Sequence, residues 1–255
     1  TGWVAATTPD IENYENNKEP FQDGLEGIHG TWSEPGVRCE ACHGPGSAHA
    51  DSPSPDNIDV VLTDGEDELE SKRCGECHFR DPNHRILISG GFIRHHEQYD
   101  EMLTSPHGPG GADFSCVTCH DPHEATKFTP ELGITKTCES CHSNVTIESV
   151  GMGGLACIDC HMPRASKSAV AFSPYEGDLK THIFAINTDA VLAADALFTT
   201  DPPDDPEGTA IVATDENGMA KVTLDFACMR CHQEGGSASV QTLDDLSAAA
   251  KLIHT

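Results

Sequence analysis

Helical periodicity of apolar residues appears in only two stretches of this chain, and the first covers residues 91–103. Phe92, His95, His96 and Tyr99 recur at intervals of three and four, which puts them on one broad face of a helix with 3.6 residues per turn. The pattern predicts an amphipathic helix that turns both histidines toward the interior.

The second helical stretch covers residues 242–254. It opens with Thr242 and Asp245, which have the spacing of a capping box. Leu246 and His254 then fall on the same apolar stripe, eight residues apart. The pattern predicts a C-terminal helix whose last histidine faces the interior.

A strand pattern is confined to residues 209–226. Residues 209–214 and 219–226 are rich in β-branched side chains, and the pair Asn217-Gly218 between them favours a tight turn. We predict one small β-hairpin here, whose free edge is suited to contact with a second protein.

The rest of the chain is polar and broken by proline and glycine, which predicts mostly coil. Residues 1–38 are expected to form an N-terminal arm, and the charge runs at 64–70 and 201–207 are expected to be solvated loops. No apolar run approaches the roughly 18 residues of a membrane-spanning helix. Only 5% of the residues are aromatic, which is a thin supply for a core made of protein alone.

One pentapeptide, Cys-x-x-Cys-His, occurs six times and uses all 12 cysteines of the chain. We number the copies motifs 1 to 6: residues 39–43, 74–78, 116–120, 138–142, 157–161 and 228–232. The pattern is typical of c-type haem attachment, in which both thiols form thioethers with one haem and the histidine binds its iron. The predicted attachment residues are Cys39, Cys42, Cys74, Cys77, Cys116, Cys119, Cys138, Cys141, Cys157, Cys160, Cys228 and Cys231. The predicted proximal ligands are His43, His78, His120, His142, His161 and His232.

Other uses of paired cysteines fit the pattern less well. Twelve thiolates suffice for three zinc ions, but zinc sites need no histidine directly after every pair. A disulfide framework needs neither the fixed spacing nor the histidines, and a thioredoxin-like motif occurs once per domain.

Six haems in 255 residues leave little more than a wrapping of protein around each porphyrin. The expected fold is therefore a haem-cored multihaem cytochrome c, mostly coil with short α-helices and the one hairpin. We expect a single domain over residues 1–255. After the N-terminal arm it comprises a five-haem segment (39–161), a haem-free segment with the hairpin (162–227), and the sixth haem with the C-terminal helix (228–255).

Nine histidines remain as candidate distal ligands: His29, His49, His84, His95, His96, His107, His123, His182 and His254. We predict iron binding for seven of them: His49, His95, His96, His107, His123, His182 and His254. Methionine is the competing ligand, but Met162 and Met229 lie inside or beside motifs, where packing on a porphyrin is the better interpretation. Exposed loop positions are the simpler interpretation of His29 and His84.

The net charge of −27 and the sequence pI near 4.6 disfavour binding to nucleic acid or to an anionic membrane surface. The charge favours basic redox partners or oxidised metal and mineral acceptors. Haem is joined to such motifs outside the cytoplasmic membrane, so export is expected. The first residue, Thr1, is what removal of a signal peptide leaves. We expect an extracellular location, with the periplasm as the alternative, and no membrane insertion.

Several strings resemble multihaem c-type cytochromes of anaerobic respiration. They are residues 36–49, 105–123, 157–164, 177–182 and 246–254, so the resemblance reaches from about residue 36 to the C-terminus. In that family the histidines at the matching positions are distal ligands, which the resemblance implies for His49, His107, His123, His182 and His254.

Within this class, a compact, acidic, exported chain looks similar to the extracellular cytochrome nanowires, which polymerise end to end. The resemblance implies long-range electron transfer through bis-histidine haems in a head-to-tail homopolymer. Such filaments include ligands donated across a subunit boundary, a role for which His29 is the candidate beside its simpler interpretation as a loop residue. A monomeric shuttle or a subunit of a respiratory complex is the alternative. An enzyme such as a nitrite or hydroxylamine oxidoreductase needs an open iron, which nine spare histidines for six haems argue against.

Overall fold

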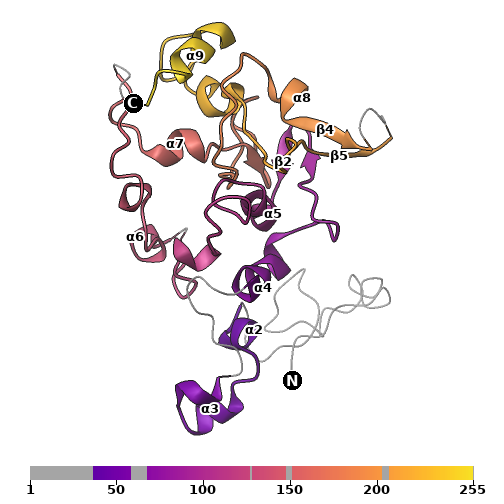
Figure 1. The fold of residues 1–255 in the computed structure, drawn as a ribbon, viewed down its shortest axis with the longest axis vertical. Coiled ribbons are helices and arrows are strands. Elements are labelled where there is room, and N and C mark those ends of the chain that lie inside the picture. Colours follow the sequence, from indigo (N-terminus) through magenta and orange to yellow (C-terminus); the bar gives the residue numbers. More distant parts are fainter. Residues whose placement is uncertain (1–36, 59–67, 127, 148–150, 203–206, 255) are drawn as a thin grey trace, which may run out of the picture. The chain divides into compact units, whose positions relative to one another are not determined.

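The computed structural model describes residues 37–58, 68–126, 128–147, 151–202 and 207–254 (Figure 1). Contacts divide the chain into two compact units, residues 1–61 and 62–255, and we describe each by itself. His29 lies outside the described residues, as do most of the predicted N-terminal arm and most of the charge run at 64–70.

The described part of the first unit carries motif 1. Two short helices, α2 (Cys39–His43) and α3 (Ser47–Asp51), are followed by the 3₁₀ turn η2 (Pro55–Asn57). Gly44, with a φ of 74°, ends α2, and the amide of Gly46 donates to Glu40 Oε1 at 2.7 Å. This hydrogen bond and the turn at Gly44 close a tight loop between the motif and α3.

The second unit combines short helical turns with very short strands. Among the described residues the longest helix, α4 (Glu68–His78), has 11 residues and no strand exceeds four. The helical elements after α4 are α5 (Gln98–Leu103), η3 (Cys116–Thr118), α6 (Pro130–Gly133), η4 (Cys138–Ser140), α7 (Cys157–His161), α8 (Ala193–Ala196), η5 (Asp225–Met229) and α9 (Leu243–Ala250). The strands are β1 (Ile88–Ser89), β2 (Phe92–Arg94), β3 (Ser166–Lys167), β4 (Phe198–Asp201) and β5 (Thr209–Val212).

Two small sheets organise this unit. In the first, β2 pairs antiparallel with β1 and parallel with β3. In the second, β4 and β5 pair antiparallel and lie side by side in Figure 1. Both sheets border one apolar core, made of Ile86, Phe92, Ile93, Ala165, Ile183, Ala193, Leu197, Val212, Ala220, Val222 and Phe226. Most of these residues come from the motif-free segment 162–227, so this segment supplies a protein core in a chain with few aromatic residues.

The predicted hairpin at 209–226 is wrong in its strand pairing. Thr209–Val212 pairs with the preceding strand β4, although the expected turn does form: Gly218 N–H donates to the carbonyl of Asp215 at 2.9 Å. Beyond the turn, Val222 N–H donates to the carbonyl of Ala185. Val222 is fully buried, so pairing with the 185–187 segment brings its side chain into the core.

The helix predicted for residues 91–103 forms only at its C-terminal end, as α5. The first part is β2, because Ile93 is fully buried and pairs with Ile88 and Ser166 on its two sides. His96 has a φ of 66°, which a right-handed helix does not accommodate. Tertiary pairing outweighs the helical periodicity here.

The C-terminal helix begins as predicted and ends early. The Thr242 side chain accepts a hydrogen bond from the amide of Asp245 at 3.2 Å. The Asp245 carboxylate in turn accepts one from the amide of Thr242. α9 then stops at Ala250, and a turn leads to His254, which forms a β-bridge with Ile147. The bridge holds the terminal histidine in place.

Asp178 anchors the loop after β3, and its removal is expected to destabilise the protein. Its carboxylate accepts from the amides of Ser168, Ala169 and Val170 at 2.6, 2.9 and 3.1 Å. Burial acts to raise the pKa of Asp178, but the three amides outweigh it and lower the pKa to about 2.

Asp178→Ala is expected to lower the free energy of unfolding by about 1 to 2 kcal/mol, because hydrogen bonds to charged groups stabilise by roughly that amount and this side chain is partly exposed. The folded pKa lies below the unfolded value of about 3.9, so the contribution is complete above pH 4 and is lost as the pH falls toward 2. Thermal unfolding at pH 7 and pH 3 measures both effects. Asp189→Ala, at a highly exposed carboxylate, is the control, and an equal loss in that variant contradicts the assignment.

Candidate haem sites

Each Cys-x-x-Cys-His motif lies on or ends in a short helical turn. Motifs 1, 2 and 5 end α2, α4 and α7, motifs 3 and 4 begin at η3 and η4, and motif 6 overlaps the end of η5. Residues three and four apart are neighbours on a helical turn, so the two thiols and the imidazole of one motif come to the same side. This is the arrangement that attachment of one haem requires.

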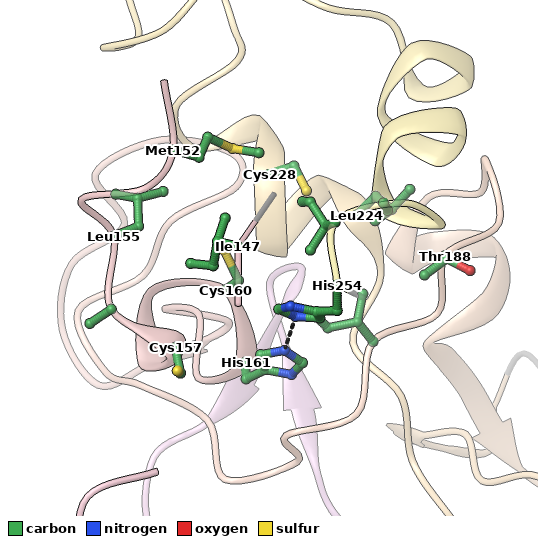
Figure 2. Close-up of a pocket in the computed structure, with 14 residues that line it drawn as sticks. Ile147, Met152, Leu155, Cys157, Cys160, His161, Thr188, Leu224, Cys228 and His254 are labelled. Atoms are coloured by element: carbon green, nitrogen blue, oxygen red, sulfur yellow. Dashed lines mark hydrogen bonds between the residues drawn. The ribbon is translucent and has the colours of Figure 1, made fainter. Parts of the chain in front are cut away.

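Motif 5 has two histidines placed as a candidate pair of axial ligands. His161 and His254 face one another with their Nε2 atoms 3.5 Å apart and their ring planes 20° from parallel (Figure 2). At the far side of each ring, Nδ1–H donates to a backbone carbonyl, Phe184 at 2.8 Å for His161 and Thr146 at 3.1 Å for His254. These bonds fix both tautomers and leave both Nε2 atoms available to a metal.

A cavity of about 170 Å³ adjoins this pair. Its walls are mainly apolar, with Ile147, Leu155 and Leu224 among them, and Cys157 and Cys160 line it as well (Figure 2). An apolar cavity with two thiols and two facing imidazoles is suited to a porphyrin attached through motif 5.

Three more motif histidines face a second histidine. His78 faces His96, His120 faces His182, and His142 faces His107, with ring centroids 6.0, 6.2 and 6.1 Å apart. Metal–imidazole bonds are about 2 Å long, so two imidazoles on opposite sides of one ion hold their nitrogens about 4 Å and their centroids about 6 Å apart. The centroid separations of the four pairs, including 5.7 Å for His161 and His254, match this value.

Burial favours the neutral, metal-binding form of these imidazoles. Burial, and then the neighbouring His182, lower the pKa of His120. Burial, and then the neighbouring His142, lower the pKa of His107, and burial with His95 lowers that of His96. Neutral imidazole is the form that binds a metal.

The candidate ligands among the described residues face one another in pairs rather than in groups of four. A structural zinc site needs about four ligands around one point. All 12 cysteines lie in the part of the chain that the structure describes, and no three or more Cys, His, Asp or Glu there are placed to hold a common metal ion. Two-histidine pairs beside paired thiols fit haem c at motifs 2, 3, 4 and 5.

The structure separates the two adjacent candidates His95 and His96. His96 takes the place opposite His78, whereas the Nε2 atom of His95 accepts a hydrogen bond from the guanidinium of Arg80. Arg80 also donates to the carbonyl of His95 at 2.7 Å, so that ring nitrogen is engaged in a local contact.

Other candidates have local partners. His49 Nδ1 donates to the carbonyl of Ser54 at 3.0 Å, and His232 of motif 6 donates to that of Ser239 at 2.8 Å, so in both rings Nε2 is the remaining ligand atom. His123 bonds through Nδ1 to Asp121 at 3.1 Å. His43 of motif 1 lies at the end of α2 in the first unit.

Two buried acidic residues near the candidate axial ligands were missed in the sequence, because the segment around α5 resembles a polar helix there. Glu101 is 1% exposed, and its Oε1 accepts from Ser166 Oγ at 3.1 Å. Its Oε2 accepts from the backbone amide of His182 at 2.7 Å and lies 3.7 Å from Nδ1 of the same residue. Burial, and then the charge of Asp100, raise the pKa of nearby Glu97 to about 8, so Glu97 is protonated at neutral pH.

Glu101→Gln is expected to raise the midpoint potential of the haem at motif 3, because a buried carboxylate beside an axial imidazole stabilises the more positive ferric state. Spectroelectrochemical titration measures the shift. Glu216→Gln, which neutralises an exposed carboxylate in the turn after β5, is the matched control and is expected to leave the potentials unchanged. Equal titration curves for wild type and Glu101→Gln contradict this role.

None of the helices in the described residues is long and apolar enough to cross a membrane.

Comparisons with known proteins find multihaem cytochromes. A family model described as a doubled CXXCH motif matches residues 107–146, which contain motifs 3 and 4 together with His107 and His123. The chain is 26% identical over 168 residues to the multiheme cytochrome MtrA of Shewanella baltica (strain OS185), a match that covers 58% of this chain and 43% of that protein. The chain therefore spans less than half the length of this curated relative.

The fold is similar to that of the octaheme sulfite reductase MccA, form II, of Wolinella succinogenes. The TM-score is 0.50 at 19% identity, over 76% of this chain and 34% of that one. The chain has six attachment motifs, and four of them have facing histidine pairs. Together with the doubled-motif match and the similarity to two multihaem proteins, these features identify the chain as a multihaem c-type cytochrome.

Proposed function

We propose that this cytochrome carries six covalently attached haems and conducts electrons through them over a long range. The observation that carries the proposal is the placement of the motifs: from motif 2 to motif 6, each contacts the next motif along the chain or the segment that leads into it. Haem c, when bound, supplies an iron that takes up and passes on single electrons. The task of the protein is then to space the haems and to hold their ligands.

The contacts follow the sequence order. α4, which carries motif 2, packs on η3 of motif 3. Motif 3 meets the segment that leads into motif 4, because the amide of Thr135 donates to the carbonyl of Cys119 at 2.9 Å. The Cys157 thiol of motif 5 donates to Glu139 of motif 4 at 3.6 Å, and Arg230 of motif 6 lies 3.5 Å from Asp159 of motif 5.

Motifs 5 and 6 are also close to one another at their thiols. Cys228 of motif 6 lines the same cavity as Cys157 and Cys160 of motif 5. Burial, and then the neighbouring Cys160, raise the pKa of Cys228 to about 12. Thiols that share one apolar cavity belong to haems whose edges are close, which is the requirement for fast electron exchange.

We further propose that the chain is exported and acts as the subunit of a head-to-tail filament outside the cell. The support is the acidic charge, the attachment chemistry that takes place outside the cytoplasm, and the nanowire resemblance. A repeated head-to-tail contact that does not close extends into a filament. Under this proposal the partners are further copies of the chain and a terminal protein, metal or mineral acceptor, and a histidine of one copy serves an iron of the next.

Two other functions have an observation in their favour. The similarity to the multiheme cytochrome MtrA favours electron transfer without a filament, as a monomeric shuttle or a subunit of a respiratory complex equally carries many haems. The fold similarity to an octaheme sulfite reductase favours an enzyme with one open haem.

The experiment that tests the proposal combines the intact mass with negative-stain electron microscopy of the native protein released from cells. The proposal predicts the chain mass plus six haems, and long filaments of uniform width. Dispersed particles with six low-spin haems favour the shuttle or complex subunit. Dispersed particles with one high-spin haem that binds sulfite or nitrite favour the enzyme.

A further inference from the structure

Phe184 has an uncommon backbone conformation close to three axial pairs. Its φ is 61°, in the left-handed region that residues with a side chain rarely adopt. The amide of Ala185 donates to the carbonyl of Ile183 at 2.7 Å, which closes a γ-turn with positive φ at Phe184. Such a turn is strained, and strain of this kind persists where the surrounding structure enforces it, commonly at functional sites.

The residues before and after Phe184 in the sequence hold the turn in place. Ile183 is fully buried in the apolar core. Ala185 accepts from the amide of Val222 at 2.9 Å, and Asn187 donates to the carbonyl of Val222 at 2.7 Å. The turn is therefore anchored to the core, and Phe184 projects from it toward the motifs.

The backbone and the ring of Phe184 contact different haem sites. Its carbonyl accepts the Nδ1–H of His161, the proximal histidine of motif 5, at 2.8 Å. Its ring stands edge-on to His107 at a centroid distance of 4.6 Å and to His182 at 6.0 Å, with interplanar angles of 87° and 88°. Edge-to-face contacts at these distances are favourable and directional. His107 faces motif 4, and His182 faces motif 3.

We infer that Phe184 is a shared positioning residue for the axial ligands at motifs 3, 4 and 5. This inference rests on the proposed bis-histidine haems and deepens that proposal, because it names what keeps three consecutive sites of the electron path in a fixed mutual geometry. The γ-turn directs the carbonyl toward one ligand and the ring toward two others. An ordinary extended conformation does not point both groups in these directions.

Phe114 offers a matched control on the same ligand. Its ring is stacked on His107 with centroids 5.7 Å apart and planes 10° apart. Among the described ring contacts, the Phe114 ring meets one candidate ligand, His107, whereas Phe184 contacts three candidate ligands. Phe114→Leu therefore reports what the loss of one aromatic contact does to one haem.

Three substitutions at Phe184 separate its ring from its backbone. Phe184→Leu removes the aromatic ring and keeps an unbranched β-carbon. Phe184→Gly removes the ring and accepts a positive φ without strain. Phe184→Val places a β-branched residue where positive φ is most unfavourable, so it displaces the carbonyl as well.

The readouts are the electron paramagnetic resonance spectrum of the oxidised protein and the individual midpoint potentials. His107→Ala, His182→Ala and His254→Ala assign the signals of motifs 4, 3 and 5, because each removes one low-spin signal. Phe184→Leu and Phe184→Gly are expected to shift the signals of motifs 3 and 4 and to leave motif 5 in place. Phe184→Val is expected to shift all three, and Phe114→Leu only that of motif 4.

The inference is overturned if Phe184→Leu and Phe184→Gly change no more signals than Phe114→Leu does. It is also overturned if Phe184→Val leaves the signal of motif 5 where Phe184→Leu leaves it. A failure of the proposed function looks different: the wild-type protein itself then lacks low-spin signals that His107→Ala, His182→Ala and His254→Ala remove.

Discussion

His254→Ala is expected to convert one haem from low spin to high spin while leaving the others low spin. The Nε2 atoms of His254 and His161 lie 3.5 Å apart, and the bond from His254 Nδ1 to Thr146 fixes the ring for this contact. Removal of the distal imidazole leaves the iron at motif 5 with one strong axial ligand. The absorption and electron paramagnetic resonance spectra of the oxidised protein measure the change.

His254 follows the last helix, so the experiment needs a control in the same segment. Leu252 is 75% exposed and two residues from His254, so Leu252→Ala tests whether disturbance of the C-terminus alone alters the spectrum. It is expected to match the wild type. A low-spin spectrum for all haems in His254→Ala removes this residue from the set of ligands.

His96→Gly is expected to convert the haem of motif 2 to high spin, whereas His95→Ala is expected to leave it low spin. The two residues are adjacent, but His96 is opposite His78 and the ring nitrogen Nε2 of His95 is bound by Arg80. Glycine is the better replacement at His96, because the φ there is 66° and an alanine adds backbone strain.

Rescue distinguishes loss of a ligand from loss of structure. Free imidazole is expected to restore the low-spin spectrum of His96→Gly by binding in the space that the side chain leaves. Spectra are recorded with and without imidazole for both variants. The assignment is contradicted if His95→Ala, and not His96→Gly, gains the high-spin signal.

The attachment motifs can be identified from sequence because they are local. Five contiguous residues specify each motif, and a helical turn then brings Cys157, Cys160 and His161 to one side without help from the rest of the fold. The capping box at Thr242 was predictable for the same reason. Both depend on spacings of three and four residues along the chain.

Partner choice between distant segments was less predictable. Residues 91–103 have a helical pattern, yet Ile93 is fully buried between two strands, one of them from more than 70 residues away along the chain. The turn at Asp215 was located correctly, but the strand after it was assigned to the wrong neighbour. A single sequence carries the period of a segment and not the identity of the segment that covers it.

Groups that support the ligands carry no local signal. Glu101 has the appearance of a surface residue on a polar helix, and Phe184 that of an ordinary apolar residue in a loop. Their roles arise because Glu101 contacts His182 from 81 positions away and the Phe184 carbonyl meets His161 from 23 positions away. Contacts of this kind appear only once the fold is assembled.

Electron cryo-microscopy of the haem-loaded protein purified from its own cells tests the central claim most directly. We predict haems 2 to 6 in sequence order with neighbouring edges in contact. In that order, His96, His182, His107 and His254 are the distal ligands at motifs 2, 3, 4 and 5. A map in which consecutive haems are separated by protein, or in which one of these four irons lacks its second histidine, contradicts the account.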